Sequence, residues 1–218
     1  MFRLLDASFG TERKRIEYYF SSIKEYEADS ILDVGCGRGL LFESIRNPDD
    51  SKLLVGVDTI RNHKEHYEHI TASATSLPIK NRVFSLITAF SLIEHIPKAD
   101  RHTFYREIKR ATKKGGKFVI QFPNRYAIIE SHTYMPFFGF LPSSMHSFAY
   151  RDEYVAVPSL KDVLRSLAKH GFHVCRIDKY KAPFLPFGSF LDKIGLFRIF
   201  PMGYIIHAQT EKTGNSNV

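Results

Sequence analysis

The sequence predicts an α/β protein built on one doubly wound sheet of seven strands, mostly parallel, with helices on both faces. Two observations support this prediction. Short apolar segments alternate with longer segments of helical periodicity along most of the 218 residues. The first strand-like segment, Ile31 to Val34, also runs directly into glycines at positions 35, 37 and 39. Such a turn lets the backbone bend sharply and approach a ligand closely.

The first helix is expected from about Thr11, because Ile16, Tyr19, Phe20 and Ile23 recur on one helical face. Strands are expected near residues 31–35, 53–58, 68–71, 83–90, 117–122, 173–180 and 203–209.

Two further helices are expected between the later strands. One near residues 99–113 has apolar residues at helical spacing and is followed by a glycine pair at 115–116, where we expect it to stop. The other begins at Ser159, which forms a capping-box-like pair with Asp162, and ends at Gly171.

The residues around the glycine turn discriminate between nucleotide cofactors. A dinucleotide loop needs its third glycine one position later, where Leu40 stands. Asp33 lies two positions before Gly35, and its carboxylate would repel a pyrophosphate but attract an ammonium or sulfonium group. The pattern therefore favours S-adenosylmethionine over a nicotinamide dinucleotide.

The run from Ile31 to Gly39 resembles the first motif of the class I S-adenosylmethionine-dependent methyltransferases, and the resemblance extends over about residues 29–123. It implies a Rossmann-like fold whose last strand is antiparallel. Asp58 ends the second predicted strand, 19 residues after Gly39, and matches the acid that holds the cofactor ribose in this family. The segment from Ala72 to Ile96 matches the family outline of adenine loop, Leu-Pro, buried strand and Glu-His.

The resemblance implies a set of cofactor-binding residues. In many relatives an acid accepts the adenine amino group where this chain has Ser73, whose hydroxyl can still accept a hydrogen bond. A second departure is Ser85, where relatives usually carry Asp. The expected cofactor-binding residues are Asp33, Gly35, Cys36, Gly37, Gly39, Asp58, Thr59, Ser73, Ala74 and Phe90.

An aromatic insert at about residues 124–158 separates the fifth strand from the next helix. It would lie at the carboxyl ends of the strands, where open α/β sheets bind ligands, so we interpret it as a cap over the acceptor pocket. Packing of the insert onto the core is the alternative. The expected acceptor-binding residues are Asn124, Tyr134 and His146, and the candidates for catalytic proton removal are His95, His132 and Glu130.

A second apolar stretch, residues 183–203, joins the last two strands. It could wall the acceptor pocket, make a peripheral contact with a membrane surface or serve as a buried connector. We favour the pocket wall.

Composition limits the partners that we expect. The formal charge of +8 comes from 31 Lys and Arg against 23 Asp and Glu, but basic residues are interleaved with acids, so nucleic acid is not favoured. His63, His66 and His69 recur at every third position, a spacing that runs round a helix surface, and no metal site is expected.

One domain over residues 1–212 and a disordered tail at 213–218 are expected. The chain has no signal-peptide pattern, no membrane-spanning apolar run and only two cysteines, which favours the cytoplasm.

Taken together, these features predict an S-adenosylmethionine-dependent methyltransferase that acts on O or C of a small, moderately hydrophobic acceptor. The residues Ala89-Phe90-Ser91-Leu92 stand where methyltransferases of exocyclic amines carry a Pro-Pro motif, which argues against that chemistry. A non-catalytic S-adenosylmethionine-binding protein and a NAD-dependent oxidoreductase are the alternatives. The sequence alone does not select the acceptor or the oligomeric state.

Overall fold

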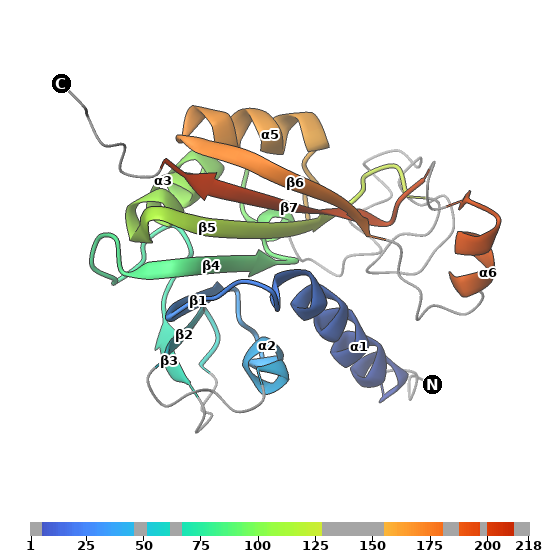
Figure 1. Cartoon of the computed structure of the whole chain (residues 1–218), viewed down its shortest axis with the longest axis horizontal. Coiled ribbons are helices and arrows are strands. Elements are labelled where there is room, and N and C mark those ends of the chain that lie inside the picture. Colours follow the sequence, from blue (N-terminus) through green and yellow to red (C-terminus); the bar gives the residue numbers. More distant parts are fainter. Residues whose placement is uncertain are drawn as a thin grey trace.

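The structure is a computed structural model that describes residues 6–45, 52–61, 67–127, 155–180, 188–196 and 200–211. Its seven strands form one sheet in the order β3-β2-β1-β4-β5-β7-β6 (Figure 1). The elements are α1 (Asp6–Ile23), β1 (Ser30–Val34), α2 (Leu40–Ser44), β2 (Leu53–Asp58), β3 (Glu68–Thr71), β4 (Phe84–Phe90), η1 (Ile93–His95), α3 (Arg101–Ala111), β5 (Thr112–Pro123), α5 (Leu160–Lys169), β6 (Phe172–Tyr180), α6 (Gly188–Lys193) and β7 (Gly203–Thr210).

The sheet reverses its direction of growth between β1 and β4. The chain runs outward from β1 through β2 to β3 and then returns to β4, which lies on the other side of β1. Strands β1 to β5 pair in parallel, whereas β7 is antiparallel to both β5 and β6. The predicted doubly wound fold with an antiparallel last strand is therefore confirmed, and its switch point is the place where such sheets bind ligands.

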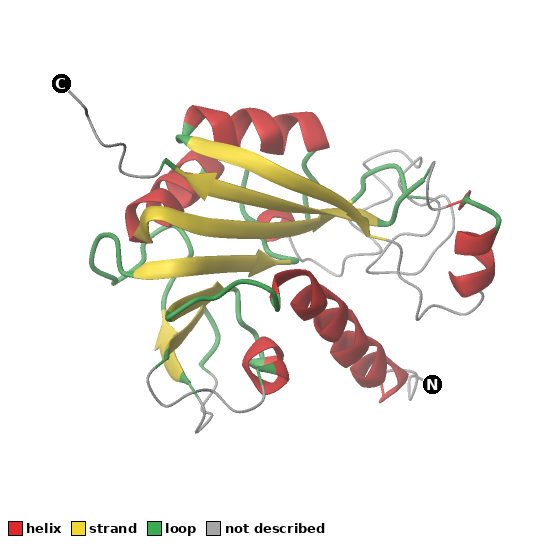
Figure 2. Ribbon diagram, viewed as in Figure 1, coloured by secondary structure: helices red, strands yellow, loops and turns green. Residues whose placement is uncertain are grey.

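Helices cover both faces of the sheet (Figure 2). Successive side chains of a central strand point to opposite faces, so they are buried against different helices. Leu32 and Val34 pack in one core cluster with residues of α3 and α5. Ile31 packs in a second cluster with residues of α1 and α2. Asp33 lies two residues after Ile31 in the same strand, so its carboxyl group shares the face of α1 and α2.

The boundaries of two helices differ from the expectation. Helix α1 begins at Asp6 rather than near Thr11, and α3 ends at Ala111 rather than at the glycine pair. The predicted end of α3 was wrong because Thr112, the residue after Ala111, already pairs with Phe84 at the start of β4. The register then shifts before Leu86, and Gly115, with φ 71°, supplies a backbone turn that other residues rarely adopt.

The guanidinium of Arg110 fixes the loop that follows β3. It donates to the carbonyl oxygens of Leu77 and Ile79, and it also binds the Glu107 carboxylate at 2.6 Å. Glu107 in turn accepts a hydrogen bond of 3.1 Å from the Leu77 amide. Helix α3 thereby holds a loop of irregular backbone whose polar groups could not pair within the sheet.

We predict that Arg110→Lys lowers the free energy of unfolding by about 1–3 kcal/mol, because an ammonium cannot reproduce the forked donation to several oxygens. Chemical denaturation of the purified chain would measure this loss. Arg106→Lys is the matched control, since Arg106 is exposed on the same helix. Equal effects of the two substitutions would contradict the role given to Arg110.

Candidate functional site

The glycine turn after β1 crosses the carboxyl end of β2. The amides of Gly35 and Cys36 both donate to the Val57 carbonyl oxygen, at 2.7 and 3.1 Å. Gly35, Gly37 and Gly39 have φ values of 77°, 49° and 72°, a region that strongly favours glycine. The sequence therefore has glycine where the backbone must turn away from the sheet.

Two of these glycines face different surroundings. A Cβ atom on Gly39 would lie 2.4 Å from the ring of Tyr67, so this position is closed by packing. A Cβ atom on Gly37 would meet nothing within 4 Å. Gly37 thus presents open backbone on the ligand side of the turn, whereas Gly39 packs the turn against Tyr67, the residue before β3.

Asp58, at the end of β2, braces the same turn. Its carboxylate accepts hydrogen bonds from the amides of Gly37 at 2.9 Å and Ile60 at 3.0 Å. A carboxylate offers about four lone-pair positions, so these two bonds leave capacity for further donors. The predicted ribose acid therefore lies beside the glycine turn and also organises it.

Asp33 is 5% exposed, and its carboxylate accepts a hydrogen bond of 2.7 Å from the Thr88 hydroxyl. Burial raises the pKa of Asp33 to about 7; the Thr88 hydrogen bond opposes this shift and the charge of Asp58 adds to it. A buried carboxylate is costly to ionise unless a cation compensates it. The site is thus suited to a ligand that brings a positive charge to Asp33.

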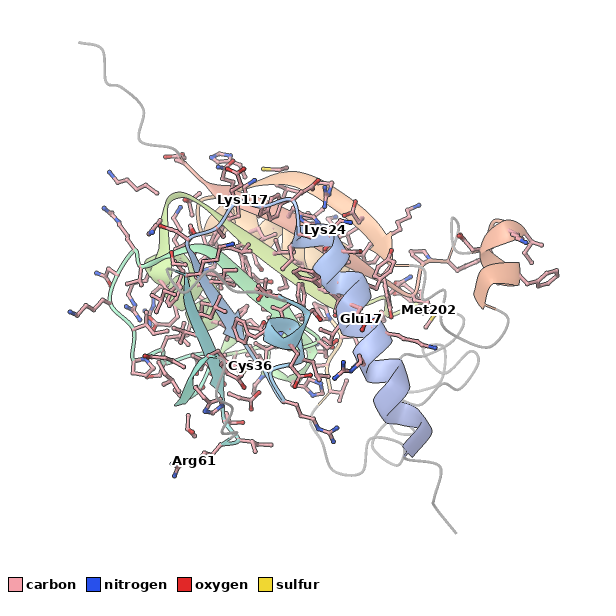
Figure 3. The ribbon with its side chains drawn as sticks, turned by 60° about the horizontal axis from the view of Figure 1, so that its bottom comes forward. Glu17, Lys24, Cys36, Arg61, Lys117 and Met202 are labelled. Carbon is pink, nitrogen blue, oxygen red and sulfur yellow. The ribbon has the colours of Figure 1, made fainter. Side chains whose placement is uncertain are left out.

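A cavity of about 160 Å³ lies at the switch point between β1 and β4. In Figure 3, Cys36 marks the glycine turn, Glu17 lies on α1 and Lys24 directly follows that helix. The turn, the end of β4 and α1 all contribute residues to the cavity. Its lining consists of Arg15, Ile16, Asp33, Gly35, Cys36, Gly37, Arg38, Leu40, Leu41, Phe90 and Ser91.

Arg15 is a site residue that the sequence analysis missed. It lies four residues before the buried Tyr19 and next to Ile16, so a cation on the otherwise apolar face of the first helix was the available signal. The structure brings this guanidinium into one cavity with the carboxyl group of Asp33. With Arg38 of the glycine turn, which also lines it, the cavity offers two positive groups and one negative group to a ligand.

The other expected cofactor residues lie around this cavity or on the loop after β3. Thr59 is exposed directly after β2. Ser73 is exposed, and its hydroxyl accepts from the Thr75 amide at 3.2 Å. Ala74 is half-buried against the core.

Ser85 has no part in this site. It lies at the amino end of β4, opposite the ligand end, and donates to Asp29 at 2.6 Å. This second departure from the family pattern therefore lies away from the glycine turn.

Strand β4 ends in a strained residue that the sequence did not reveal. Ser91 has φ 51°, an unusual value for a residue with a side chain. Its amide and hydroxyl both donate to the side-chain oxygen of Gln121, each at 2.9 Å, which holds this conformation. The chain thereby turns from the cavity into η1, which carries Glu94 and His95.

Of the expected catalytic residues, only His95 lies within the described part of the chain. It is half-buried at the end of η1, next to the fully buried Glu94. Glu130 and His132 lie outside the described residues, and so do the expected acceptor-binding residues Tyr134 and His146.

Asn124 lies at the carboxyl end of β5, where its side chain connects two segments. Its amide group donates to the Pro201 carbonyl oxygen at 2.9 Å, and its carbonyl oxygen accepts from the Tyr126 amide at 3.1 Å. These bonds fix the start of the predicted cap. Acceptor binding by Asn124 stays a prediction.

The apolar stretch at 183–203 contains the short helix α6, which projects from the sheet in Figure 1. Phe190 and Ile194 are 58% and 59% exposed, so a buried connector was the wrong interpretation for these two residues. Among its described residues, none lines the cavity beside the glycine turn. No helix in the described part of the chain is long and apolar enough to cross a membrane.

Known proteins resemble this chain in sequence and in fold. A family model described as a methyltransferase domain matches residues 32–120. A ubiquinone biosynthesis O-methyltransferase from Coxiella burnetii is 30% identical over 136 residues, which are 55% of this chain and 55% of that protein. The chain thus spans about half the length of the curated relatives it matches.

Two solved structures extend the likeness over most of the chain. A SAM-dependent methyltransferase from Archaeoglobus fulgidus superposes with a TM-score of 0.66 at 16% identity, covering 91% of this chain and 94% of that one. A 1,6-didemethyltoxoflavin-N1-methyltransferase from Burkholderia thailandensis, solved with S-adenosylhomocysteine, gives 0.61 at 11% identity, with coverage of 92% and 78%. At such identities the likeness establishes the fold.

We predict that Gly39→Ala destabilises the chain more than Gly37→Ala. Both substitutions strain a left-handed backbone by roughly 1 kcal/mol, but only the first forces an atom into Tyr67. Thermal unfolding of the two variants beside the wild type measures the difference. A Gly37→Ala variant as unstable as Gly39→Ala would refute the packing role of Gly39.

Proposed function

We propose that this protein, whose residues 32–120 match a family model of a methyltransferase domain, transfers a methyl group from S-adenosylmethionine to O or C of a small, moderately hydrophobic acceptor. The chain has the fold of the class I S-adenosylmethionine-dependent methyltransferases over nearly its whole length. The fold alone does not determine the reaction, so the argument depends on the groups that surround the cavity.

The observation that supports this proposal most strongly is the buried carboxyl group of Asp33 beside an open glycine turn. A dinucleotide would bring a pyrophosphate to that turn, and the negative charges of Asp33 and Asp58 would oppose it. S-adenosylmethionine instead brings an ammonium and a sulfonium. The position of the third glycine and the carboxyl group of Asp33 therefore disfavour the NAD-dependent alternative, while Arg15 and Arg38 in the same cavity suit a ligand carboxylate.

The residues present fit the whole cofactor. Asp33 and Arg15 in one cavity suit the amino and carboxylate groups of an amino acid. Asp58 has acceptor capacity for the two ribose hydroxyls, and Ser73 and Ala74 lie on the loop expected to hold the adenine. Gly37 leaves room for the close approach of a ligand to the backbone.

When bound, S-adenosylmethionine supplies a methyl group on a positively charged sulfur, which leaves as a neutral thioether. The protein has to align the acceptor, exclude water and remove a proton where the acceptor is a hydroxyl. Phe90 and Ser91 form the rigid wall at the end of β4, and His95 follows them as the proton acceptor. In this proposal His132 and Glu130 assist from the cap, and Asn124, Tyr134 and His146 contact the acceptor.

We predict that affinity for S-adenosylhomocysteine falls about tenfold between pH 8 and pH 6. Asp33, with its pKa raised to about 7, is ionised at the higher pH and protonated at the lower one, where it no longer attracts the ligand ammonium. Isothermal titration calorimetry at both pH values measures the change. Asp33→Asn should bind weakly at both values, and a variant that kept the pH dependence would contradict the assignment.

The same shift determines the sign of a stability effect in the ligand-free chain. The folded pKa of Asp33 lies above its unfolded value, so the stabilising contribution of the protonated carboxyl group is lost as pH rises through about 7. Asp33→Asn should therefore raise the unfolding temperature at pH 8 more than at pH 5. Thermal unfolding at the two pH values provides this measurement, which is independent of the ligand.

Parallel calorimetric titration with S-adenosylmethionine, S-adenosylhomocysteine and NAD tests the cofactor directly, and transfer of a labelled methyl group tests the reaction. We expect the two sulfur ligands to bind and NAD not to bind. Asp58→Ala should weaken the binding of S-adenosylhomocysteine at least about tenfold, because it removes the acceptor for the ribose hydroxyls and the hydrogen bond to the Gly37 amide. Binding of NAD alone would contradict the proposal, whereas cofactor binding without methyl transfer would favour the non-catalytic alternative.

A further inference from the structure

A second cavity lies on the other helical face, between α3 and α5, which Figure 1 shows on the same side of the sheet. Its volume is about 350 Å³, within the range of roughly 300–1,000 Å³ typical of small-molecule pockets. Four permanently charged cations and two histidines line it, against one carboxylate. The charged and titratable lining residues are Lys98, Arg101, His102, Arg125, Asp162, Lys169 and His170.

The single carboxylate, Asp162, is already engaged at the start of α5. It accepts a hydrogen bond of 2.6 Å from the Ser159 hydroxyl, and it lies 3.7 Å from the exposed Arg165. Its charge also acts on Lys98, so one carboxylate faces cations from two other chain segments and from the end of α5, and the pocket is positive overall. A concave surface lined by charges of one sign concentrates the field and attracts an anion of opposite sign.

His170 supplies a buried nitrogen that nothing in the described part of the chain satisfies. Its Nδ1 lies 2.7 Å from the Ser166 carbonyl oxygen, so Nδ1 carries a proton and donates it. Its Nε2 is buried and has no hydrogen-bond partner among the described residues.

His102 lies against His170, with ring centroids 4.7 Å apart. Desolvation, followed by the positive charges of His170 and Lys169, lowers the pKa of His102. Neighbouring positive charges oppose the protonation of His102, and an anion bound between them would favour its protonated form. The two rings therefore also provide a reporter of anion binding.

Hydrogen bonds connect the pocket to the segments at the carboxyl ends of the strands, where the proposed methyl-transfer site lies. The Ala156 amide, next to the lining residue Val157, donates to the Glu94 carbonyl oxygen at 2.7 Å. Arg101 donates to the carbonyl oxygens of Ile96 and Ala156, which closes the wall between η1 and α5. Arg125 follows β5 by two residues.

Chain length also limits the separation of the two places. Lys98 is four residues after Glu94 and Arg125 is four residues after Gln121, so each Cα atom lies within about 14 Å of the corresponding site residue. A small molecule of moderate length spans such a distance. In the arrangement proposed below, an acceptor whose reacting end lies beside Ser91 and His95 would place its other end in this pocket.

We infer that this basic pocket binds the terminal phosphate group of the methyl acceptor, so that the substrate is a phosphorylated small molecule. The inference rests on the proposed methyl transfer and adds the chemical class of the acceptor to it. The exposed Arg125 and Lys169 supply charged donors for the phosphate oxygens, Arg101 holds the wall of the pocket, and the histidine pair completes the anion site.

The pocket itself is tested with inorganic phosphate and the full chain. Histidine ring signals in NMR spectra are followed during titration with phosphate, with chloride at equal ionic strength as reference. We expect saturable shifts of His102 and His170 and a rise in the pKa of His102. The double variant Arg125→Gln/Lys169→Gln should bind phosphate at least about tenfold more weakly. The control Lys161→Gln, an exposed change on α5 outside the pocket, should bind phosphate like the wild type.

The absence of a saturable response in the wild type, or equal weakening by Lys161→Gln, would overturn the anion site. Titration with S-adenosylhomocysteine distinguishes this failure from failure of the proposed function, because the cofactor cavity shares no residue with the basic pocket. The double variant should retain its affinity for S-adenosylhomocysteine.

The source of the phosphate is tested with labelled S-adenosylmethionine and a small-molecule extract of the organism that encodes the chain. We expect a labelled product that disappears when the extract is first treated with a phosphatase, which is then removed. A product that persists after this treatment would overturn the acceptor claim and make the anion a separate effector. No product from the untreated extract would contradict the methyl transfer on which the claim rests.

Discussion

The burial of one carboxyl group, that of Asp33, is the constraint on which the candidate site depends. Strand β1 is paired on both sides, by β2 and by β4, so Asp33 cannot move toward water without breaking the centre of the sheet. Its hydrogen bond to Thr88 relieves only part of the cost of burial, as the raised pKa shows. The remaining cost selects for a cationic ligand and against an anionic one.

The neighbouring groups strengthen this selection. Asp58 holds the Gly37 amide, and its negative charge adds to the raised pKa of Asp33. Arg15 enters from α1 and gives the same cavity a positive group, which is compatible with a ligand that carries both charges. The glycine turn adds a second guanidinium, that of Arg38, and its open backbone at Gly37 supplies space. Charge and space together define which ligand fits.

Local pattern was sufficient to predict some of the site. Asp33, the three glycines and Asp58 stand at the ends of two successive strands, where parallel pairing brings them together whatever the rest of the chain does. Arg15 and Gln121 could not be predicted in the same way, because their positions depend on how α1 and β5 pack. The end of α3 at Ala111 likewise depends on the pairing of Thr112 with Phe84, a contact between distant segments.

The basic pocket could be predicted from local sequence pattern even less than Arg15 or Gln121. It also indicates how an acceptor would be oriented. Its cations come from after η1, after β5 and from the end of α5, so no local run of charge revealed them. The two cavities differ in charge. The cofactor cavity holds Asp33 together with Arg15 and Arg38, whereas the basic pocket has four cations against one carboxylate and attracts an anionic group more strongly. A phosphorylated acceptor would therefore enter in one orientation, with its uncharged reacting end toward Ser91 and His95. Charge would thus determine which end of the acceptor reaches the methyl group.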